Sequence, residues 1–230
     1  KSVRALVLVP TRELAQQVYQ SITQYGQLTV LKAAIAYGGV SINPQVEQIR
    51  AGIDILVATP GRLFDHLIKG SLTLDKLQVL VFDEAERMLD MGFKDEIGNI
   101  MKRVPDKRQT LLFSATFDDA IFKLSKKLLK DPELIEVDQR NTAAERVEQI
   151  VYTVDGDRKR ELVSHLIGAR NWHQVLIFVR TRQGADLLVR EMSKDGIKAQ
   201  AIHGDRSQGA REKALTEFKA GKVRALVATD

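Results

Sequence analysis

Short runs of Val, Ile and Leu recur along the chain and alternate with longer stretches whose apolar residues are spaced as on one face of a helix. The runs are continuously apolar, which is typical of strands buried on both faces of a sheet. They occupy residues 4–10, 54–60, 79–84, 110–116, 175–181 and 224–230. The amphipathic stretches at residues 13–26, 118–130, 184–196 and 209–221 predict helices. Strands that alternate with helices predict the α/β fold class, with parallel sheets flanked by helices and right-handed crossovers.

The pattern is interrupted at residues 137–149, a polar stretch without the signature of a buried strand. The strand-like sequence QIVYTVD, at residues 149–155, follows it and begins a new series of strands and helices. A chain of 230 residues also exceeds the usual size of one domain. We therefore predict two domains, at residues 1–140 and 141–230.

The net charge is +5, and it is unevenly distributed. Residues 1–138 hold 18 Lys and Arg against 18 Asp and Glu, whereas residues 139–230 hold 17 against 12. This excess permits a polyanionic partner, but solvated helix faces account for it equally. Aromatic residues make up only 6% of the chain, so a nucleic acid is expected to be held by its backbone rather than by stacked bases.

The sequence has no cysteine, which excludes disulfides and thiolate metal sites. No apolar run is long enough to span a membrane, and the first residues, KSVRALVLVP, lack the pattern of a signal peptide. We expect a cytoplasmic location and no membrane partner.

Polar residues stand at the end of one predicted strand after another. The segments are PTRELA (10–15), TPGR (59–62), DEAE (83–86), SAT (114–116), VRT (179–181), HGD (203–205) and ATD (228–230). Open parallel sheets bind ligands beyond the carboxyl ends of their strands, because loops and helix N-termini converge there. The repetition predicts functional sites along these edges.

Asp83 and Glu84 directly follow the apolar run VLVF. A strand-end Asp is suited to bind Mg²⁺, directly or through water, because this ion prefers a few carboxylates plus phosphate oxygens. Its neighbour Glu84 is suited to polarise a water that attacks a terminal phosphate. The alternative is that Asp83, Glu84 and Glu86 form the acidic first turn of a helix, which the helix dipole favours.

Two strand-to-helix junctions pair a threonine with an arginine, Thr11 with Arg12 and Thr59 with Arg62. Backbone amides at a helix N-terminus bind phosphate, and an arginine adds a planar fork of donors. These junctions, together with Gly61, are therefore candidate contacts to a nucleic-acid backbone. The simpler alternative makes both threonines helix caps.

Two further segments carry weaker signals. The glycine pair before Val40 permits close backbone approach at another strand end, or is simply a turn. Gln208 and Arg211 are one helical turn apart beside a strand end, a spacing that a surface helix also shows by chance. The histidines lack the spacing of metal ligands, so His203 is predicted to be structural.

Together these segments resemble the DEAD-box RNA helicases of superfamily 2, in order and spacing, over essentially the whole chain. The segments RMLDMGF, RNTAAERVEQ and HGDRSQGAR are most similar to the bacterial RhlE-type branch. The resemblance implies two RecA-like domains that close over ATP and RNA and separate short duplexes locally. It implies ATP and Mg²⁺ as cofactors and RNA as the partner, bound with little sequence specificity.

The resemblance also implies roles for single residues. Asp83 coordinates Mg-ATP through water and Glu84 activates the attacking water, while Ser114 and Thr116 couple the nucleotide site to the RNA site. The residues implied along the RNA backbone are Pro10, Thr11, Arg12, Gly39, Thr59, Gly61, Arg62, Gln208, Arg211 and Thr229.

One residue of the name motif departs from the family. Glu86 stands where the family has an aspartate that bonds toward SAT. We expect this change to weaken the coupling of hydrolysis to RNA binding but to leave magnesium binding intact.

A second departure is that no G-x-x-x-x-G-K-[ST] phosphate loop occurs in the 230 residues. The family's adenine-sensing segment and its last, arginine-bearing motif are also absent. We expect a central fragment with both domains truncated, unpaired strand edges in the first sheet, and little or no ATP hydrolysis by residues 1–230 alone. One alternative stays open, a non-catalytic RNA-binding protein with a helicase-like fold. A translocase that acts on DNA is a second enzyme class, but PTRELA, TPGR and SAT together point to the RNA branch.

Overall fold

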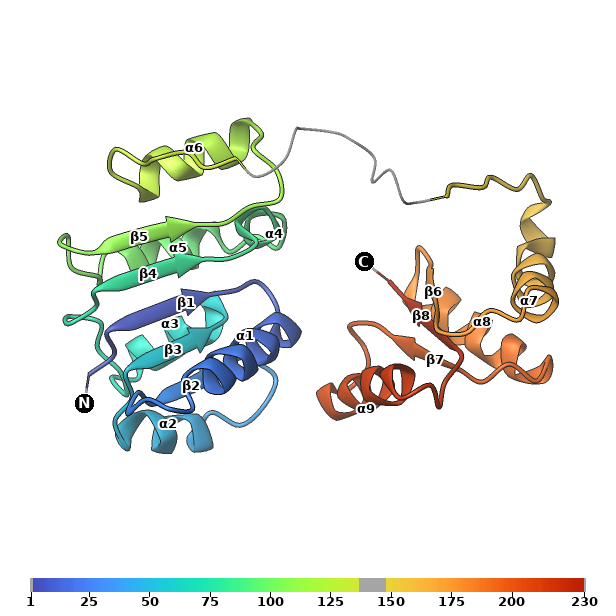
Figure 1. The fold of residues 1–230 in the computed structure, drawn as a ribbon, viewed down its shortest axis with the longest axis horizontal. Coiled ribbons are helices and arrows are strands. Elements are labelled where there is room, and N and C mark those ends of the chain that lie inside the picture. The colour runs from blue at the N-terminus through green and yellow to red at the C-terminus, as the bar shows by residue number, and fades with distance from the viewer. Residues whose placement is uncertain (1, 137–147, 230) are drawn as a thin grey trace. The chain divides into compact units, whose positions relative to one another are not determined.

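The computed structural model describes residues 2–136 and 148–229. The chain divides into two compact units, residues 1–137 and 138–230 (Figure 1). The predicted domain boundary between residues 140 and 141 lies outside the described residues, as does most of the predicted linker at 137–149. Each unit is a parallel sheet flanked by helices, which confirms the predicted α/β class.

Unit 1 contains a five-stranded sheet in the order β2-β3-β1-β4-β5. Its strands are β1 (Ala5–Leu8), β2 (Ala33–Ala36), β3 (Ile55–Ala58), β4 (Val79–Phe82) and β5 (Gln109–Leu112). All neighbouring pairs are parallel. The helices of this unit are α1 (Arg12–Tyr25), α2 (Asn43–Arg50), α3 (Pro60–Ile68), α4 (Ala85–Asp90), α5 (Lys94–Met101) and α6 (Asp119–Leu128).

The alternation of side chains along the strands builds two cores. Leu6 and Leu8 of β1 face the larger core, to which helices α2 to α6 contribute residues such as Met88. Val7 and Val9 face the other side, where α1 covers β2 and β3 in a smaller core. Figure 1 shows α1 in front of the sheet and α3 and α5 behind it. The continuous apolar runs follow from this burial on both faces.

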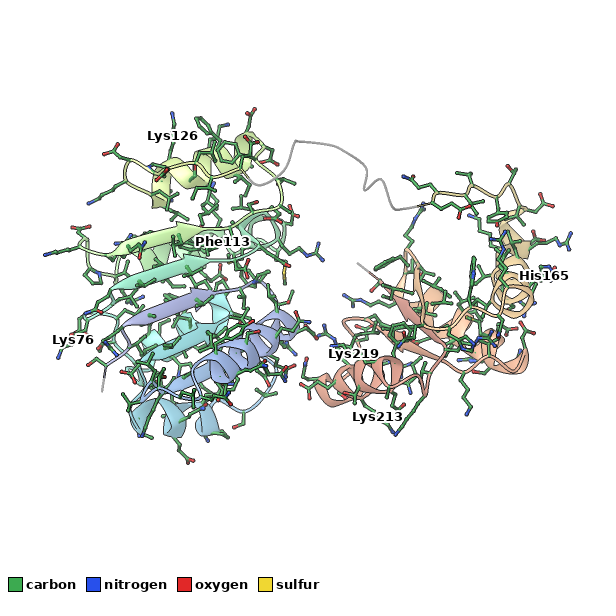
Figure 2. The ribbon with its side chains drawn as sticks, viewed as in Figure 1. Lys76, Phe113, Lys126, His165, Lys213 and Lys219 are labelled. Carbon is green, nitrogen blue, oxygen red and sulfur yellow. The ribbon has the colours of Figure 1, made fainter. Side chains whose placement is uncertain are left out.

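Helix α1 does not extend over the β5 side of the sheet. On the face that α1 occupies elsewhere, Leu111 and Phe113 are 36% and 54% exposed, and Figure 2 labels Phe113 just beyond β5. Among the described strands, β5 pairs only with β4 and is an edge strand. Strand β2 is the other edge of the described sheet, and part of the face beside β5 is not covered by a helix.

Unit 2 contains a three-stranded parallel sheet in the order β6-β8-β7. Its elements are the 3₁₀ helix η1 (Gly156–Arg158), α7 (Lys159–Ala169), β6 (Val175–Phe178), α8 (Arg182–Lys194), β7 (Ala199–Ile202), α9 (Gln208–Lys219) and β8 (Ala225–Ala228). Ala225 and Val227 of the central strand are buried against Met192 of α8.

The prediction of a strand at residues 149–155 is wrong for the described residues. Residues 148–155 form no strand and pair with none of the described strands. Val151 is 94% exposed, so the apolar run that suggested a strand is not buried. A lone strand cannot satisfy its backbone groups, and this apolar run has no neighbour in the described sheet to pair with.

No helix among the described residues has both the length and the apolar character needed to cross a membrane.

Candidate nucleotide and nucleic-acid site

The carboxyl ends of the five strands of unit 1 lie along one edge of the sheet, because every pair is parallel (Figure 1). Strands β2, β3 and β1 are neighbours and end at GG, TPGR and PTRELA. Strands β4 and β5 lie next to them and end at DEAE and SAT. The strand order therefore puts the predicted phosphate-contacting segments over three adjacent strands and the predicted catalytic segments over the other two.

Asp83 and Glu84 form the corner between β4 and α4. The amide of Asp83 donates to the carbonyl oxygen of Leu8 in β1, at 3.0 Å. Asp83 Oδ1 accepts from the amide of Glu84, also at 3.0 Å. Glu84 has φ 53° and ψ 54°, in the left-handed region, which lets the chain turn sharply from strand into helix. This turn keeps both carboxylates at the end of β4.

The charges at this corner suit a cation. Glu84 is exposed, yet its pKa is raised above the usual value, first by partial desolvation and then by the charges of Asp83 and Glu86. Among the described residues, no ion pair to Lys, Arg or His neutralises Asp83 or Glu84.

The same described residues contain no cluster of three or more His, Cys, Asp or Glu that could hold a metal ion by themselves. The carboxylates therefore fit a Mg²⁺ ion that takes most of its ligands from water and phosphate, and do not form a closed protein cage.

Glu86 connects the ends of β4 and β5. Its carboxylate accepts a hydrogen bond from Ser114 Oγ at 2.5 Å and from the amide of Ala115 at 3.2 Å. The amide of Ala85 donates to the carbonyl of Phe113 at 3.1 Å, which adds a backbone link between the same segments. The side chain of Glu86, one methylene longer than the family's aspartate, thus reaches SAT. Thr116 is also tied to this turn, since its amide lies 3.4 Å from Ser114 Oγ.

The PTRELA segment begins α1. Thr11 is the N-cap residue, and its hydroxyl accepts from the amide of Leu14 at 3.2 Å. Pro10 is buried between β1 and this cap. Arg12 reaches across to the end of β2, where a Cβ added to Gly39 would lie 2.3 to 2.5 Å from the guanidinium atoms. Gly39 has φ 76°, a conformation that favours glycine, and a Cβ there would also make the guanidinium of Arg12 move.

The TPGR segment begins α3. Thr59 is the N-cap residue, but its side chain makes no capping hydrogen bond, so the simple cap alternative holds for Thr11 and not for Thr59. Gly61 lies in the first turn. The side chain of Arg62 is only 10% exposed and donates to the carbonyl of Val40 at 2.9 Å. Arg62 thus holds the end of the glycine segment, a role in which the sequence alone did not place it.

Gln45 and His66 also contribute to this region, and the sequence reading missed both. Gln45 is 8% exposed and His66 is fully buried. Gln45 Oε1 lies 3.1 Å from Arg62 Nη1 and 3.2 Å from His66 Nε2. The sequence signal that could have found them is a polar residue at a core-facing position of a helix. Gln45 is buried in α2 together with Val46, and His66 is buried in α3 together with Leu63.

In unit 2 the predicted residues lie at the ends of β7 and β8 and at the start of α9. Gln208 is the first residue of α9, is 8% exposed, and donates to Glu212 Oε1 at 3.0 Å. Arg211 lies one turn later in the same helix. Thr229 follows β8, and its amide donates to the carbonyl of Ile202 at 3.4 Å.

His203 anchors the HGD segment to α8, in agreement with its predicted structural role. It is 5% exposed, and its Nε2 lies 3.1 Å from Asp186 Oδ1. Asp186 also pairs with Arg206 at 2.5 Å. The hydrogen bond from His203, followed by that from Arg206, lowers the pKa of Asp186. Next to it, Arg182 pairs with Asp205 at 2.6 Å.

Comparison with known families identifies this arrangement. The sequence profile of the DEAD/DEAH box helicase family matches residues 1–124, more than half of the chain. The chain belongs to the DEAD/DEAH box helicase family. The profile of the helicase conserved C-terminal domain matches residues 157–230. The predicted DEAD-box family is thereby confirmed.

Individual relatives agree with the DEAD/DEAH box assignment. The chain is 42% identical over 230 residues to the ATP-dependent RNA helicase RhlB of Pseudomonas aeruginosa, covering 99% of this chain and 58% of the relative. It is 39% identical over 229 residues to the ATP-dependent RNA helicase CshA of Listeria monocytogenes, covering all of this chain and 44% of the relative. The narrower resemblance to the RhlE-type branch stays a prediction.

A solved structure of a DEAD-box relative has the same fold. Dbp5 of S. cerevisiae, bound to RNA and ADP BeF3, superposes with a TM-score of 0.87 at 26% identity, covering 99% of this chain and 58% of that one. The fold is therefore α/β with RecA-like helicase units. The chain spans less than two thirds of the length of the relatives it matches here.

Proposed function

We propose that this chain is the nucleotide- and RNA-handling part of an ATP-dependent RNA helicase that separates or remodels short RNA duplexes. The observation that carries the proposal is the edge of the first sheet. Asp83 and Glu84 at the end of β4 are joined through Glu86 to Ser114 at the end of β5. The predicted RNA segments follow the three strands next to them. Relatives named as ATP-dependent RNA helicases support it.

ATP and Mg²⁺ are the proposed cofactors. Bound Mg-ATP supplies the phosphoryl group that is cleaved and the cation that neutralises charge on the phosphates. Asp83 would hold the magnesium, since its carboxylate ends β4 and makes no ion pair among the described residues. Glu84 orients and deprotonates the attacking water, and its raised pKa brings the carboxylate closer to the pH at which a general base is effective.

RNA is the proposed macromolecular partner, held mainly by its phosphates. The amides at the starts of α1 and α3, after Thr11 and Thr59, are suited to bind phosphate oxygens. Gln208, Arg211 and Thr229 of unit 2 add candidate contacts of their own. Phosphate contacts give little sequence specificity and a strong dependence on salt. We place the protein in the cytoplasm, in keeping with a chain that contains no cysteine.

The second candidate is an RNA-binding protein without catalysis. It is favoured by one observation: the 230 residues contain no phosphate loop, whose amides and lysine hold the triphosphate in this family. We therefore expect residues 1–230 alone to bind RNA without measurable ATP hydrolysis.

Phosphate release, measured with and without RNA, separates the two candidates. We expect that joining a segment with the family's phosphate loop ahead of Lys1 produces RNA-stimulated hydrolysis. We also expect that Glu84→Gln in the same protein lowers its rate at least a hundredfold while leaving RNA affinity unchanged. Hydrolysis that stays absent in the joined protein would leave the RNA-binding candidate.

Glu86 is the proposed link between hydrolysis and RNA. Its hydrogen bonds to Ser114 and Ala115 couple the ends of β4 and β5. Because the side chain of glutamate is longer than that of aspartate, we expect it to transmit a movement of one strand end to the other less directly. In the joined protein, Glu86→Asp is expected to increase the stimulation of phosphate release by RNA. Equal stimulation in both proteins would show that the extra methylene does not affect coupling.

A further inference from the structure

A buried chain of hydrogen bonds runs behind the glycine segment that ends β2. It begins at Ser71, whose Oγ lies 2.8 Å from His66 Nδ1. His66 Nε2 lies 3.2 Å from Gln45 Oε1, and the same oxygen lies 3.1 Å from Arg62 Nη1. The chain ends on the backbone of the glycine segment at both sides, since Gln45 Nε2 and Arg62 Nη2 each donate to a carbonyl oxygen there.

The partners of Gln45 fix the direction of the three hydrogen bonds that its side chain makes. Gln45 Nε2 donates to the carbonyl of Tyr37 at 3.1 Å, which requires the amide nitrogen on that side. Its oxygen must then accept from Arg62, because a guanidinium has no acceptor. The same oxygen also accepts from His66 Nε2, so His66 carries its proton on Nε2 and accepts from the Ser71 hydroxyl at Nδ1. Ser71 Oγ also lies 3.2 Å from the carbonyl oxygen of His66. Because a hydroxyl has one proton, the neutral tautomer uses it for Nδ1 and leaves the bond to that carbonyl unmade.

The two carbonyls that are held this way belong to Tyr37 and Val40 and bracket the glycine pair. Arg62 donates to the carbonyl of Val40 at 2.9 Å, and Gln45 donates to that of Tyr37 at 3.1 Å. Between them, Gly39 lies against the guanidinium of Arg12. The segments that end β1, β2 and β3 therefore meet at these side chains, of which Gln45 and His66 are buried and Arg12 and Arg62 are partly exposed. The glycine segment has no regular secondary structure of its own.

We infer that His66 is a positioning residue for RNA binding: through Gln45 and Arg62 it holds the segment between Tyr37 and Val40 in its RNA-binding conformation. The inference rests on the proposed RNA-binding function of this edge. It also changes the role of Arg62, whose buried guanidinium acts on the protein backbone rather than mainly on phosphate.

Two replacements of His66 distinguish positioning from simple packing. The amide nitrogen of glutamine can take the place of Nε2 and keep the bond to Gln45, whereas that of asparagine takes the place of Nδ1 and faces Ser71. Both replacements reduce the size of a buried side chain, asparagine by one methylene more than glutamine, so a role in packing alone predicts a graded loss of RNA affinity in both variants that parallels their loss of stability. Positioning through Gln45 predicts that only the glutamine variant keeps its affinity.

The test measures the affinity of the 230-residue chain for a fluorescein-labelled single-stranded oligouridylate by anisotropy at constant salt. We expect His66→Asn to weaken binding about tenfold and His66→Gln less than about threefold, the difference corresponding to one buried hydrogen bond. The matched control is His165→Asn at an exposed position of α7 in unit 2 (Figure 2), which we expect to bind as the unchanged chain does. Circular dichroism verifies that each variant folds.

A second measurement keeps the inference testable if His66→Asn does not fold. Long-range ¹H–¹⁵N spectra of the unchanged chain must show His66 protonated on Nε2, and in His66→Gln the amide signals of Gly38 and Gly39 must stay near their original positions. Equal loss of affinity in both His66 variants, a proton on Nδ1, or displaced glycine signals would each overturn the inference. If the unchanged chain does not bind the oligouridylate, the proposed RNA-binding function fails as well; if it binds and His66→Asn binds equally well, only the inference fails.

Discussion

Position 39 favours glycine mainly because its backbone has a positive φ, and the guanidinium of Arg12 lies close to it. A Cβ there would lie 2.3 Å from the nearest guanidinium atom, and the backbone has φ 76°. Gly39→Ala is therefore expected to destabilise unit 1 by about 1 to 2 kcal/mol and to weaken RNA binding. The measurement is chemical denaturation followed by circular dichroism, together with RNA anisotropy.

Gly38 provides the matched control for Gly39. A Cβ at Gly38 meets nothing within 4 Å, and its φ lies outside the left-handed region. Gly38→Ala should change stability by less than about 0.5 kcal/mol. A Gly39→Ala protein as stable as the Gly38→Ala protein would show that neither the positive φ nor the movement of Arg12 costs stability.

His66 should make the stability of unit 1 depend on pH. Its pKa is lowered, first by burial and then by the charge of Arg62; Lys69 lowers it further and Asp65 raises it. The unfolded chain, with an ordinary histidine pKa of about 6.5, then binds more protons than the folded chain just below that pH. The contribution of His66 to the free energy of unfolding is therefore fully present above pH 6.5. It decreases as the pH falls, by at most about 1.4 kcal/mol per pH unit.

The comparison that isolates this effect uses His66→Gln, which has no titrating group at position 66. Between pH 7 and pH 5 we expect the unchanged chain to lose more stability than the variant. Hydrogen exchange of unit 1 amides is the suitable probe, because the single tryptophan, Trp172, belongs to unit 2. Parallel pH profiles for the two proteins would contradict the expectation.

Candidate residues at the strand ends could be recognised in the sequence more readily than residues that act through buried hydrogen bonds. Asp83 and Glu84 were recognisable because acids directly follow an apolar run. Gln45 and His66 were not, because their importance comes from the hydrogen bonds that link Gln45 of α2 to Arg62 and His66 of α3, and the sequence gives no sign of such tertiary contacts. The φ of Glu84 was likewise invisible, since nothing in the residue type indicates a left-handed backbone.

At the scale of elements, the start of α1 depends on a hydroxyl and the start of α3 does not. Thr11 accepts from the amide of Leu14, whereas Thr59 makes no such bond. Thr11→Val, which keeps the shape but removes the acceptor, is expected to destabilise unit 1 by about 1 kcal/mol, and Thr11→Ser to restore most of it. Thermal denaturation of the variants, with Thr59→Val as control, checks this; an equal loss from Thr59→Val would contradict it.

The elements themselves were largely predictable, and the failures have physical reasons. Each of the six apolar runs holds all or most of a strand, although β5 and β6 have no buried residue and their runs do not reflect burial on both faces. The strands β2 and β7 gave no such run because their residues, AAIA and AQAI, are mostly small or polar. Residues 149–155 gave a false strand, because periodicity cannot reveal whether a neighbouring strand is present.

At the scale of the whole molecule, the excess of positive over negative residues lies in residues 139–230, which hold 17 Lys and Arg against 12 Asp and Glu. If Arg211 contacts a phosphate, Arg211→Gln should weaken RNA binding similarly for different sequences. It should also reduce the slope of log K against log salt by about 0.7, the value per phosphate for single strands. Arg190→Gln, at an exposed position of α8, is the control. An unchanged slope would remove Arg211 from the proposed contacts.

Glu84 occupies a backbone conformation that glutamate adopts reluctantly, with φ 53° and ψ 54°. Asparagine tolerates this conformation better and lacks the carboxylate. Glu84→Asn is therefore expected to raise the stability of unit 1, by roughly 0.5 to 1 kcal/mol in chemical denaturation, while it removes the proposed general base. The corner of β4 would then be a place where stability has been given up for activity. A screen for more stable variants would favour substitutions of Glu84 that remove the proposed general base.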